Sequence, residues 1–297
     1  STNALRLIHA ESDGLPGLVV DRYNDVLVVQ ILSAGAEHWR ETIIGCLSDV
    51  PGVNTIVERS DVDVRTLEGL EPRSGVLYGT APKTVEIFEN GLKFQVNVLT
   101  GQKTGFYIDQ RRNRQMVGEL AKNREVLNCF CYTGGFSLYA LANGAAHVIS
   151  VDSSSEALES GKTNLEINGL PALKSDWLEG DVFKVLRRLR EEDLKFDMVI
   201  LDPPKFAPTA AQAERAARGY KDINLIAFKL LRPDGILATL SCSGGVSAEL
   251  FQKIVAGAAA DAGMDARIIQ TLTQGPDHPV ALGFPEGAYL KGLIVQV

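Results

Sequence analysis

Apolar and polar positions along the chain fall into two regimes, and the first occupies residues 1–98. Short β-rich apolar runs are separated there by turn-forming residues, and one stretch has helical spacing. Asn24-Asp25 and Glu89-Asn90-Gly91 are typical of hairpin turns. The pattern predicts a small α+β strand-strand-helix-strand-strand domain at residues 18–23, 26–32, 37–47, 53–57 and 85–98, where the last part is a hairpin of the runs 85–88 and 92–98. The polar residues 60–74 are predicted as a loop, and this domain shows no catalytic constellation.

The second regime begins at residue 125, where short apolar runs alternate with helical segments. The runs span residues 126–130, 147–151, 177–178, 198–201 and 236–240, and helices are predicted at 155–168 and 182–192. Such alternation predicts an α/β fold, with a mostly parallel sheet and helices on both of its faces. Residues 99–297 are therefore predicted as the second domain. Because ligands of such sheets bind at the carboxyl ends of the strands, we expect the chemistry there.

Composition narrows the class of protein. Of 297 residues, 45% are hydrophobic and 23% are charged, which is ordinary for a globular protein with a sizeable core. No apolar run approaches the ~20 residues of a transmembrane helix, and the first four residues do not resemble a signal peptide. With four cysteines, which fit a reducing compartment, the chain is expected to be cytoplasmic and to bind no membrane. A net charge of -7 argues against tight non-specific binding of nucleic acid.

A glycine pair follows the first strand of the second domain. It closes the stretch Asn128-Cys129-Phe130-Cys131-Tyr132-Thr133-Gly134-Gly135. Glycines after a buried strand let the backbone turn sharply and approach a ligand closely. The N-terminus of the helix that follows can face an anion or a carboxylate. The spacing is not G-x-G-x-x-G, so the dinucleotide-binding fingerprint is absent.

Acidic residues end the next two strands. Asp152 comes 18 residues after Gly134, where a carboxylate can accept hydrogen bonds from ribose hydroxyls. Capping of the next helix is the alternative, but Ser153 and its neighbours could cap it equally well. Asp181, which precedes Val182, could hold an exocyclic adenine amine or cap a helix, and the sequence favours neither interpretation.

The fourth strand ends in Asp202-Pro203-Pro204-Lys205. Two prolines after an apolar run fix an extended turn, which can hold Asp202 and the proline carbonyls against a flat base. A purely structural turn rarely needs this combination at the end of a buried strand. We therefore favour a functional interpretation of this motif.

Cys242 ends the fifth strand and is followed by two glycines. A cysteine is often a small buried hydrophobe, but a strand end in this fold faces the ligand crevice. Cys242 is therefore a candidate for chemistry. Cys129 and Cys131 are interpreted as packing residues, because two cysteines without a nearby histidine do not make a zinc site.

A polar segment, residues 100–111, comes just before the second domain's first strand. Two glycines predict a tight loop, and Asp109 can cap a helix that begins at Gln110. Its side chains are more varied than a linker needs, so we predict a lid over a cofactor. The lid residues are Lys103, Phe106, Tyr107, Asp109, Gln110 and Arg111.

Together these motifs resemble one family. G-Q-K-T-G-F-Y-I-D-Q-R, L-N-C-F-C-Y-T-G-G-F-S, V-D-S, D-V-F, L-D-P-P-K-F and S-C-S are similar to the bacterial large-subunit ribosomal RNA cytosine-5 methyltransferases, above all to the ribosomal RNA large subunit methyltransferase I group. F-P-E-G-A-Y-L-K-G-L at residues 284–293 extends the likeness to nearly the whole chain. The resemblance implies a class I, Rossmann-like domain with a mostly parallel seven-stranded sheet, which uses S-adenosylmethionine (SAM). In that family an RNA-binding PUA domain comes first, and we expect this chain to lack it.

The resemblance also implies residue roles. The lid residues would close over SAM, while Asn128, Phe130, Tyr132, Thr133 and Gly134 would hold its methionine part. Asp152 and Ser153 would bind the ribose, and Asp181 with Val182 would bind the adenine. Asp202 and Pro203 would meet a flipped base, and Cys242 would be the nucleophile. No metal is implied, large-subunit ribosomal RNA is the expected partner, and the oligomeric state, including a homodimer, stays open.

The implied mechanism begins with addition of the Cys242 thiolate to cytosine C6. Addition makes C5 enamine-like and ready for methylation, and loss of the C5 proton then releases the cysteine. Because a free thiol has a pKa near ~8.5, Cys242 needs some stabilisation of its thiolate. Asp202 could bond to the ring N3 or the exocyclic amine, Lys205 could contact a phosphate, and the acceptor of the C5 proton stays unassigned. The base must be single-stranded or flipped out.

Several rivals remain open. Asp-Pro-Pro also resembles motifs that serve N-methylation of adenine or guanine, but that chemistry needs no thiol nucleophile. Methylation of uracil at C5 would use the same cysteine. A non-catalytic RNA-binding or assembly module is disfavoured by the intact lid and strand-end acids. A nicotinamide oxidoreductase is disfavoured by the missing glycine fingerprint.

Overall fold

A computed structural model describes residues 1–206 and 212–297, and their contacts divide the chain into two compact units. The first unit comprises Ser1–Arg111 and Gly275–Gly287, and the second comprises Arg112–Gln274 and Ala288–Val297. The segment Gly275–Gly287 thus belongs to the first unit although it comes near the end of the chain. No pattern in the sequence predicted that residues 275–287 belong to the first unit.

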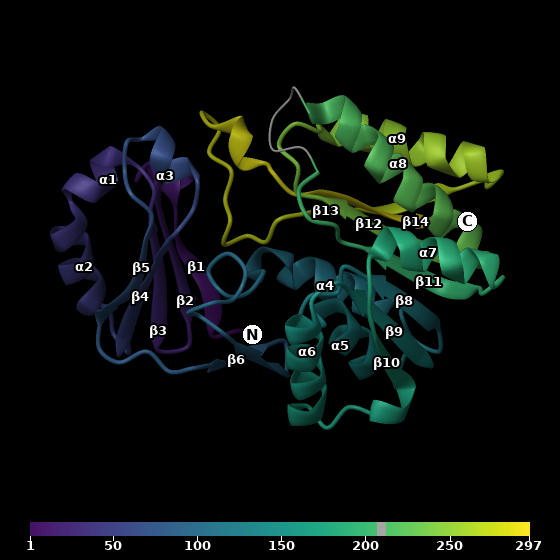
Figure 1. Ribbon diagram of the computed structural model, residues 1–297, viewed down its shortest axis with the longest axis horizontal. Helices are drawn as coiled ribbons and strands as arrows, with labels where there is room; N and C mark the ends of the chain where they lie inside the picture. The colour runs from purple at the N-terminus through teal and green to yellow at the C-terminus, as the bar shows by residue number, and fades with distance from the viewer. Residues whose placement is uncertain (207–211) are drawn as a thin grey trace. The chain divides into compact units, whose positions relative to one another are not determined.

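The first unit is built on a five-stranded sheet in the order β1-β2-β3-β4-β5, with a separate β6-β7 hairpin (Figure 1). Only the pair β3 and β4 is parallel in this sheet; the other neighbours are antiparallel. The elements are β1 (Ala4–His9), β2 (Leu18–Tyr23), β3 (Val26–Ile31), α1 (Ala34–His38), α2 (Arg40–Ser48), β4 (Thr55–Ser60), α3 (Val64–Leu67), β5 (Arg73–Tyr78), β6 (Val85–Glu89) and β7 (Leu92–Val96), with short 3-10 turns at Ala10–Asp13, Ile108–Gln110 and Pro285–Gly287.

The prediction of a loop at residues 60–74 was wrong. Helix α3 and the start of β5 lie there. The helix is organised by Arg65, which is 1% exposed, pairs with Glu37 at 3.0 Å and donates to the Glu71 carbonyl at 2.8 Å. Strand β5 lies at the edge of the sheet with mostly exposed side chains, so it lacks the alternation that marks a strand with one buried face.

The second unit contains the predicted seven-stranded sheet, in the order β10-β9-β8-β11-β12-β14-β13. Strand β14 is antiparallel to both of its neighbours, while the pairs from β10 to β12 are parallel. This confirms the fold class. The elements are α4 (Arg111–Glu119), β8 (Glu125–Cys129), α5 (Gly135–Ala142), β9 (His147–Asp152), α6 (Ser155–Ile167), β10 (Ser175–Glu179), α7 (Val182–Glu191), β11 (Phe196–Leu201), α8 (Ala213–Leu230), β12 (Leu231–Ser241), α9 (Ala248–Ala262), β13 (Arg267–Thr273) and β14 (Lys291–Gln296), with a 3-10 turn at Ala172–Lys174.

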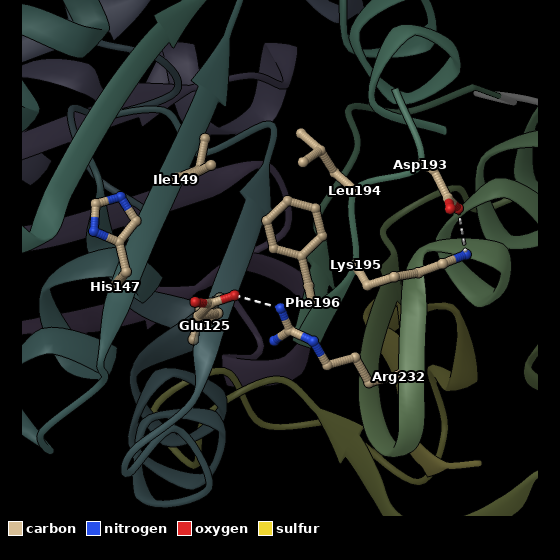
Figure 2. A pocket seen from close by; sticks show the side chains of 9 residues that line it. Glu125, His147, Ile149, Asp193, Leu194, Lys195, Phe196 and Arg232 are labelled. Atoms are coloured by element: carbon tan, nitrogen blue, oxygen red, sulfur yellow. Dashed lines mark hydrogen bonds and ion pairs between the residues drawn. The ribbon is translucent and has the colours of Figure 1, made fainter. Parts of the chain in front are cut away.

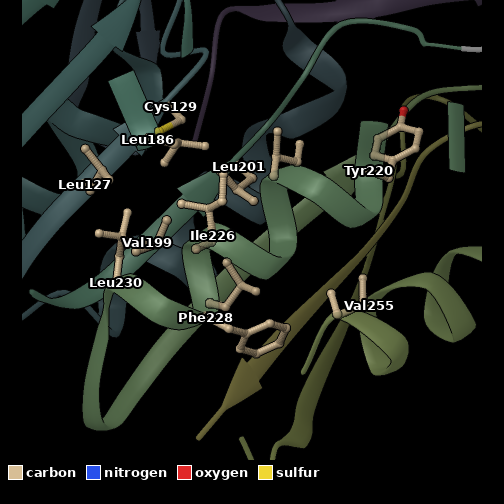
Figure 3. Close-up of a cluster of buried hydrophobic side chains, with 14 of the residues drawn as sticks. Leu127, Cys129, Leu186, Val199, Leu201, Tyr220, Ile226, Phe228, Leu230 and Val255 are labelled. Atoms are coloured by element: carbon tan, nitrogen blue, oxygen red, sulfur yellow. The ribbon is translucent and has the colours of Figure 1, made fainter. Parts of the chain in front are cut away.

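Helices cover both faces of this sheet with two separate cores. Buried side chains of α7, α8 and α9 pack with Leu127, Val199 and Leu201 of the strands on one face (Figure 3). Side chains of α4, α5 and α6 pack with Val126 and Ile200 on the other face. Successive strand residues therefore serve opposite cores, which explains the continuous apolar runs of the central strands. Among the described residues, no helix has the length and apolar content that crossing a membrane requires.

The strand order reverses between β8 and β11. From β8 the chain proceeds outward to β9 and β10, and it then returns to β11 on the other side of β8. Ligands of open α/β sheets bind beyond the carboxyl ends of the strands at such a reversal. The loops after β8 and β11 are therefore the first place to look for a site.

A glycine of α6 allows this helix to pack closely on β10. A Cβ atom at Gly161 would lie 2.3 Å from Cζ3 of Trp177, whereas one at Gly257 of α9 would meet nothing closer than 3.8 Å. We expect Gly161→Ala to lower the free energy of unfolding by about 1–3 kcal/mol, because the rigid indole must move. Gly257→Ala should raise it by about 0.5–1 kcal/mol through better helix propensity. Urea unfolding followed by circular dichroism measures both, and a stabilised Gly161 variant would contradict the packing argument.

Candidate active site

The loop after β8 is tightly wound. Phe130, Tyr132 and Gly134 have positive φ angles of 60°, 49° and 78°. A Cβ atom at Gly134 would lie 2.5 Å from Cη2 of Trp177, so only glycine fits at this point. The glycine signal found in the sequence thus corresponds to a real steric requirement at the carboxyl end of β8.

Asp152 ties this loop to the end of β9. Its carboxylate accepts hydrogen bonds from the backbone N–H of Tyr132 at 2.8 Å and of Ser154 at 3.0 Å. The cap of helix α6 is Ser154, whose hydroxyl accepts from the Ala157 N–H at 3.2 Å. Asp152 is therefore not the helix cap, and its half-buried carboxylate lies at a strand end beside the exposed Ser153.

Buried polar side chains support the same loop. The Asn128 amide donates to the Ser137 hydroxyl at 2.8 Å, and this hydroxyl lies 2.7 Å from that of Ser150. Asn164 of α6 donates to the Thr133 carbonyl at 3.2 Å. Because Asn128 is fully buried, its side chain acts on the loop from within the protein. These interactions fix the backbone that a ligand would meet.

Asp181 caps helix α7, with its carboxylate accepting from the Lys184 N–H at 3.2 Å. The capping interpretation therefore describes this residue, although its exposed side chain retains room for further hydrogen bonds. The Val182 side chain is buried in the core formed with α8 and α9, so a ligand could meet only its backbone. Sequence reasoning could not separate these two readings, because both place an acid before a helix.

The loop after β11 joins the loop after β12. Asp202 is half-buried, Pro203 is buried, and Lys205 is exposed. The Phe206 N–H donates to the Ser243 hydroxyl at 3.0 Å. The Phe206 ring lies 4.7 Å from Tyr220 and 5.9 Å from Phe183, measured between centroids. The Asp-Pro-Pro motif and Cys242 are thus held on adjacent loops.

Cys242 comes directly after β12 and is partly exposed. Its neighbours Ser241 and Ser243 both bond to the Tyr220 hydroxyl, at 2.9 Å each. Cys129 and Cys131 are buried, and burial raises the pKa of the Cys131 thiol well above its ordinary value. Of the three cysteines in the second unit, only Cys242 therefore combines accessibility with a strand-end position.

The predicted lid belongs to the first unit. An ion pair and a cation–π contact, both made by Lys103, organise it. The Lys103 ammonium lies 3.3 Å from the Asp109 carboxylate and 4.3 Å from the centroid of the Tyr107 ring. The Tyr107 hydroxyl donates to Gln102 at 2.6 Å. Asp109 lies inside the 3-10 turn Ile108–Gln110, and helix α4 begins at Arg111.

Two buried hydrogen bonds and an ion pair anchor the lid within the first unit. The Thr104 hydroxyl donates to the Asp21 carboxylate at 2.6 Å, and the Phe106 N–H donates to the Tyr23 hydroxyl at 3.2 Å. At the other end, Arg111 pairs with Asp277 at 3.2 Å. Although burial opposes it, the adjacent His278 ring, whose Nδ1 lies 3.4 Å from the carboxylate, and the Arg111 guanidinium lower the pKa of Asp277 to about 2.

His9 makes the first unit sensitive to pH. Burial and the adjacent Arg6 guanidinium, 3.0 Å from Nδ1, lower the pKa of His9 to about 4. The folded protein therefore keeps a neutral ring where the unfolded chain, with an ordinary pKa near ~6.5, takes up a proton. The free energy of unfolding should therefore be highest above pH ~6.5 and should fall by about 1–2 kcal/mol as the pH drops towards 4. This loss is smaller than the difference between the two pKa values alone would give, because the ring is partly exposed.

Urea unfolding at pH 7, 5.5 and 4.5 measures this loss. His9→Gln, whose side-chain oxygen can also accept from Arg6, should show a smaller loss over the same interval. Equal losses in the two proteins would mean that other groups cause the pH dependence.

Sequence reasoning missed one charged residue close to Cys242. Lys291 begins β14, is 9% exposed, and donates to the backbone carbonyls of Ser243 at 2.7 Å and Val246 at 2.6 Å. A lysine set between Leu290 and Gly292-Leu293, at the start of an apolar run, was the signal that could have revealed it.

A cavity of about 540 Å³ lies at the opposite, amino end of the sheet (Figure 2). Glu125, His147 and Phe196, which line it, begin β8, β9 and β11. Its charged groups pair among themselves: Arg232 lies 2.6 Å from Glu125, and Lys195 lies 3.5 Å from Asp193. This arrangement presents no converging set of polar groups to a ligand, so the strand-end loops remain the candidate site.

Comparisons with known proteins identify the family. The family model of S-adenosylmethionine-dependent methyltransferases matches residues 68–283. A protein of Tolumonas auensis named ribosomal RNA large subunit methyltransferase I is 56% identical over 296 residues, which are 99% of this chain and 75% of the relative. A protein of the same name from Shewanella amazonensis is 54% identical over 293 residues, covering 98% and 74%.

Solved structures share the fold. A protein crystallised with SAH matches 100% of this chain and 76% of its own, with a TM-score of 0.88 at 24% identity. The tRNA m1G37 methyltransferase of M. jannaschii matches 95% of this chain and 76% of its own, with a TM-score of 0.63 at 18% identity. At these identities the likeness concerns the fold alone.

Proposed function

Because the chain belongs to the ribosomal RNA large subunit methyltransferase I family of SAM-dependent methyltransferases, we propose that it methylates C5 of a cytosine in large-subunit ribosomal RNA. Cys242 is the nucleophile in this proposal. One observation carries it: a partly exposed thiol at the carboxyl end of β12, beside the Asp202-Pro203 loop, in a unit whose other two cysteines are buried. Residues 1–98 are assigned to positioning of the RNA, and residues 99–297 to catalysis.

The loops after β8 and β9 suit SAM. The turn from Phe130 to Gly134 is tight and has no room for a side chain at Gly134, and this favours close approach of the methionine part to the backbone there. The Asp152 carboxylate suits ribose hydroxyls, and the exposed Asp181 suits the adenine amine. The segment with Lys103, Tyr107 and Asp109 is assigned as the lid. When bound, SAM supplies an electrophilic methyl group.

The protein's own residues would perform the remaining chemistry. The Cys242 thiolate adds to C6 of the cytosine, and the electron pair of the C5–C6 double bond makes C5 nucleophilic. Asp202 holds the ring by accepting a hydrogen bond from the exocyclic amine, or by donating one to N3 when its carboxyl is protonated, and Lys205 contacts a phosphate of the RNA. After methylation, transfer of the C5 proton to a base, to which no residue is assigned, restores the double bond and expels Cys242 as a thiolate. Pro203 keeps the loop stiff, so the base and the thiol stay aligned.

The fold does not decide which atom receives the methyl group, since a tRNA m1G37 methyltransferase shares it. N-methylation requires no thiol, so an accessible cysteine beside the Asp-Pro-Pro loop favours the C5 reaction over the N-methylation rival. Methylation of uracil C5 would use the same sulfur and differs only in the base that Asp202 accepts.

Nucleoside mass spectrometry tests the proposal. Large-subunit ribosomal RNA transcribed in vitro, and thus unmodified, is incubated with the enzyme and isotope-labelled SAM, then digested to nucleosides. We expect labelled 5-methylcytidine. Labelled N-methyladenosine, N-methylguanosine or 5-methyluridine as the sole product would replace the cytosine assignment, and absence of any labelled nucleoside would favour a non-catalytic module.

A further inference from the structure

The loop that carries Cys242 is held by a buried lysine from another strand. Lys291 is paired with Ser241 in the antiparallel register of β12 and β14. Its ammonium donates to the carbonyl of Ser243, the residue after Cys242, at 2.7 Å, and to the carbonyl of Val246 at 2.6 Å. The ammonium therefore contacts the backbone of the residue that follows Cys242. It also links Ser243 to Val246, the two ends of the segment 243–246.

Holding a loop with a buried ammonium group costs free energy. Burial penalises the charged form of an amine, and an uncharged donor could satisfy backbone carbonyls without that cost. Lys291 is 9% exposed. An ammonium also has three N–H donors, and the two carbonyls account for two of them. Hydrogen bonding to the loop therefore does not explain why the buried side chain at position 291 is charged.

Electrostatic coupling between Lys291 and Cys242 offers an explanation. Burial lowers the pKa of Lys291, the Cys242 thiolate raises it, and the neighbouring Lys205 lowers it. The interaction is mutual, so a charged Lys291 favours the thiolate of Cys242 to the same extent. A nucleophilic cysteine needs this help, because only the thiolate attacks carbon.

We propose that Lys291 is a positioning residue for the methyl-transfer reaction, which holds the Cys242 loop through Ser243 and Val246 and stabilises the thiolate with its buried charge. This inference rests on the proposed role of Cys242 as the nucleophile. It adds a residue on β14, outside the segments that the sequence motifs marked as catalytic. It also answers the requirement, evident from the sequence, that some group must favour the thiolate.

Other charged or titratable groups lie on the elements that neighbour the Cys242 loop. Lys205 and Asp202 come from the loop after β11, with opposite charges, and Tyr220 comes from α8. Lys205 is exposed, so water screens its charge more than that of Lys291. Burial and the charge of the thiolate both raise the pKa of Tyr220, which therefore stays neutral near pH 7. Lys291 is thus the cation with the strongest expected effect.

The test measures alkylation of Cys242 against pH in the full chain, without RNA or SAM. Iodoacetamide reacts with thiolates, and peptide mass spectrometry separates Cys242 from the exposed Cys46, which serves as an internal reference in every sample. In the wild type, the midpoint of the pH profile should lie lower for Cys242 than for Cys46. In Lys291→Gln, which keeps an N–H donor for the loop but loses the charge, the Cys242 rate at pH 7 should fall about tenfold.

Two further variants separate charge from tethering. Lys291→Arg retains the charge and should keep the low midpoint of Cys242, whereas Lys291→Met loses both charge and donor and should behave at least as poorly as the glutamine variant. Unchanged alkylation rates of Cys46 in all variants show that the activity of the reagent and the state of the first unit are the same in every sample. A wild-type midpoint for Cys242 at or above that of Cys46 would overturn the proposal even if the variants failed to fold.

A Cys242 profile in Lys291→Gln identical to that of the wild type would overturn it as well. These outcomes are independent of product analysis. If the enzyme yields no 5-methylcytidine but the profiles shift as described, the proposed function fails while the coupling between Lys291 and Cys242 stands.

Discussion

Cys242→Ala is expected to reduce formation of labelled 5-methylcytidine by at least about a thousandfold, a loss typical of removing a covalent nucleophile. SAM affinity should stay within about twofold, because the alanine removes one sulfur from the loop after β12 and leaves the loops after β8 and β9 intact. Cys242→Ser should lose nearly as much, since a serine hydroxyl is far less ionised than a thiol at neutral pH. The measurements are nucleoside mass spectrometry for the product and calorimetric titration for SAM.

Cys46→Ala provides the matched control. Cys46 is exposed on α2 of the first unit, and its replacement should leave product formation unchanged. Thermal unfolding should also be similar in the two alanine variants, because neither side chain fills a fully buried position. Substantial 5-methylcytidine from Cys242→Ala would remove the covalent step, and with it the main reason to prefer C5 over a ring or exocyclic nitrogen.

Strand-end positions were the most predictable part of this protein, for a physical reason. Central parallel strands serve a core on each face, so they appear in the sequence as continuous apolar runs with sharp ends. Asp152, Asp202 and Cys242 each follow such a run directly, and their places at the carboxyl ends of β9, β11 and β12 could be derived from one chain alone. The glycine at position 134 was equally readable from its place after an apolar strand, and in the structure Trp177 leaves no space for a side chain there.

Other features were hidden because they depend on contacts between distant segments. Strand β5 and helix α3 are polar on the surface and owe their order to a buried arginine, Arg65, whose partners lie on α1 and on a neighbouring loop. The return of Gly275–Gly287 to the first unit rests on pairs such as Arg111 with Asp277, separated by more than half the chain. Lys291 was missed likewise, since its importance comes from the Ser243 and Val246 carbonyls on another loop.

Local ambiguity explains the remaining difficulty. An acid that precedes a helix can cap it or bind a ligand, and spacing does not separate the two uses. The acids that follow β9 and β10 differ in this respect. Asp181 caps α7, whereas α6 is capped by Ser154 and not by Asp152. This difference makes Asp152 the sharper target for a binding experiment.

Asp152→Asn is expected to weaken SAM binding by about 10- to 100-fold, which corresponds to loss of one or two hydrogen bonds to a charged group. The carboxylate now accepts from the N–H groups of Tyr132 and Ser154 at once, and an amide must turn its NH₂ group towards one of these donors. The substitution therefore removes the charge that suits ribose hydroxyls and loosens the loop from Phe130 to Gly134. Calorimetric titration with SAM and with SAH measures both affinities.

Asp176→Asn is the matched control for this measurement. Asp176 is an exposed acid near the amino end of the neighbouring strand β10, where it pairs with His147 at 2.8 Å, far along the strand from the carboxyl-end loops. Its replacement changes the net charge by the same amount as Asp152→Asn but should leave SAM affinity unchanged. Equal affinities in all three proteins, with thermal unfolding intact, would show that the cofactor does not depend on the acid at the end of β9. The SAM site would then have to be sought away from the loops after β8 and β9.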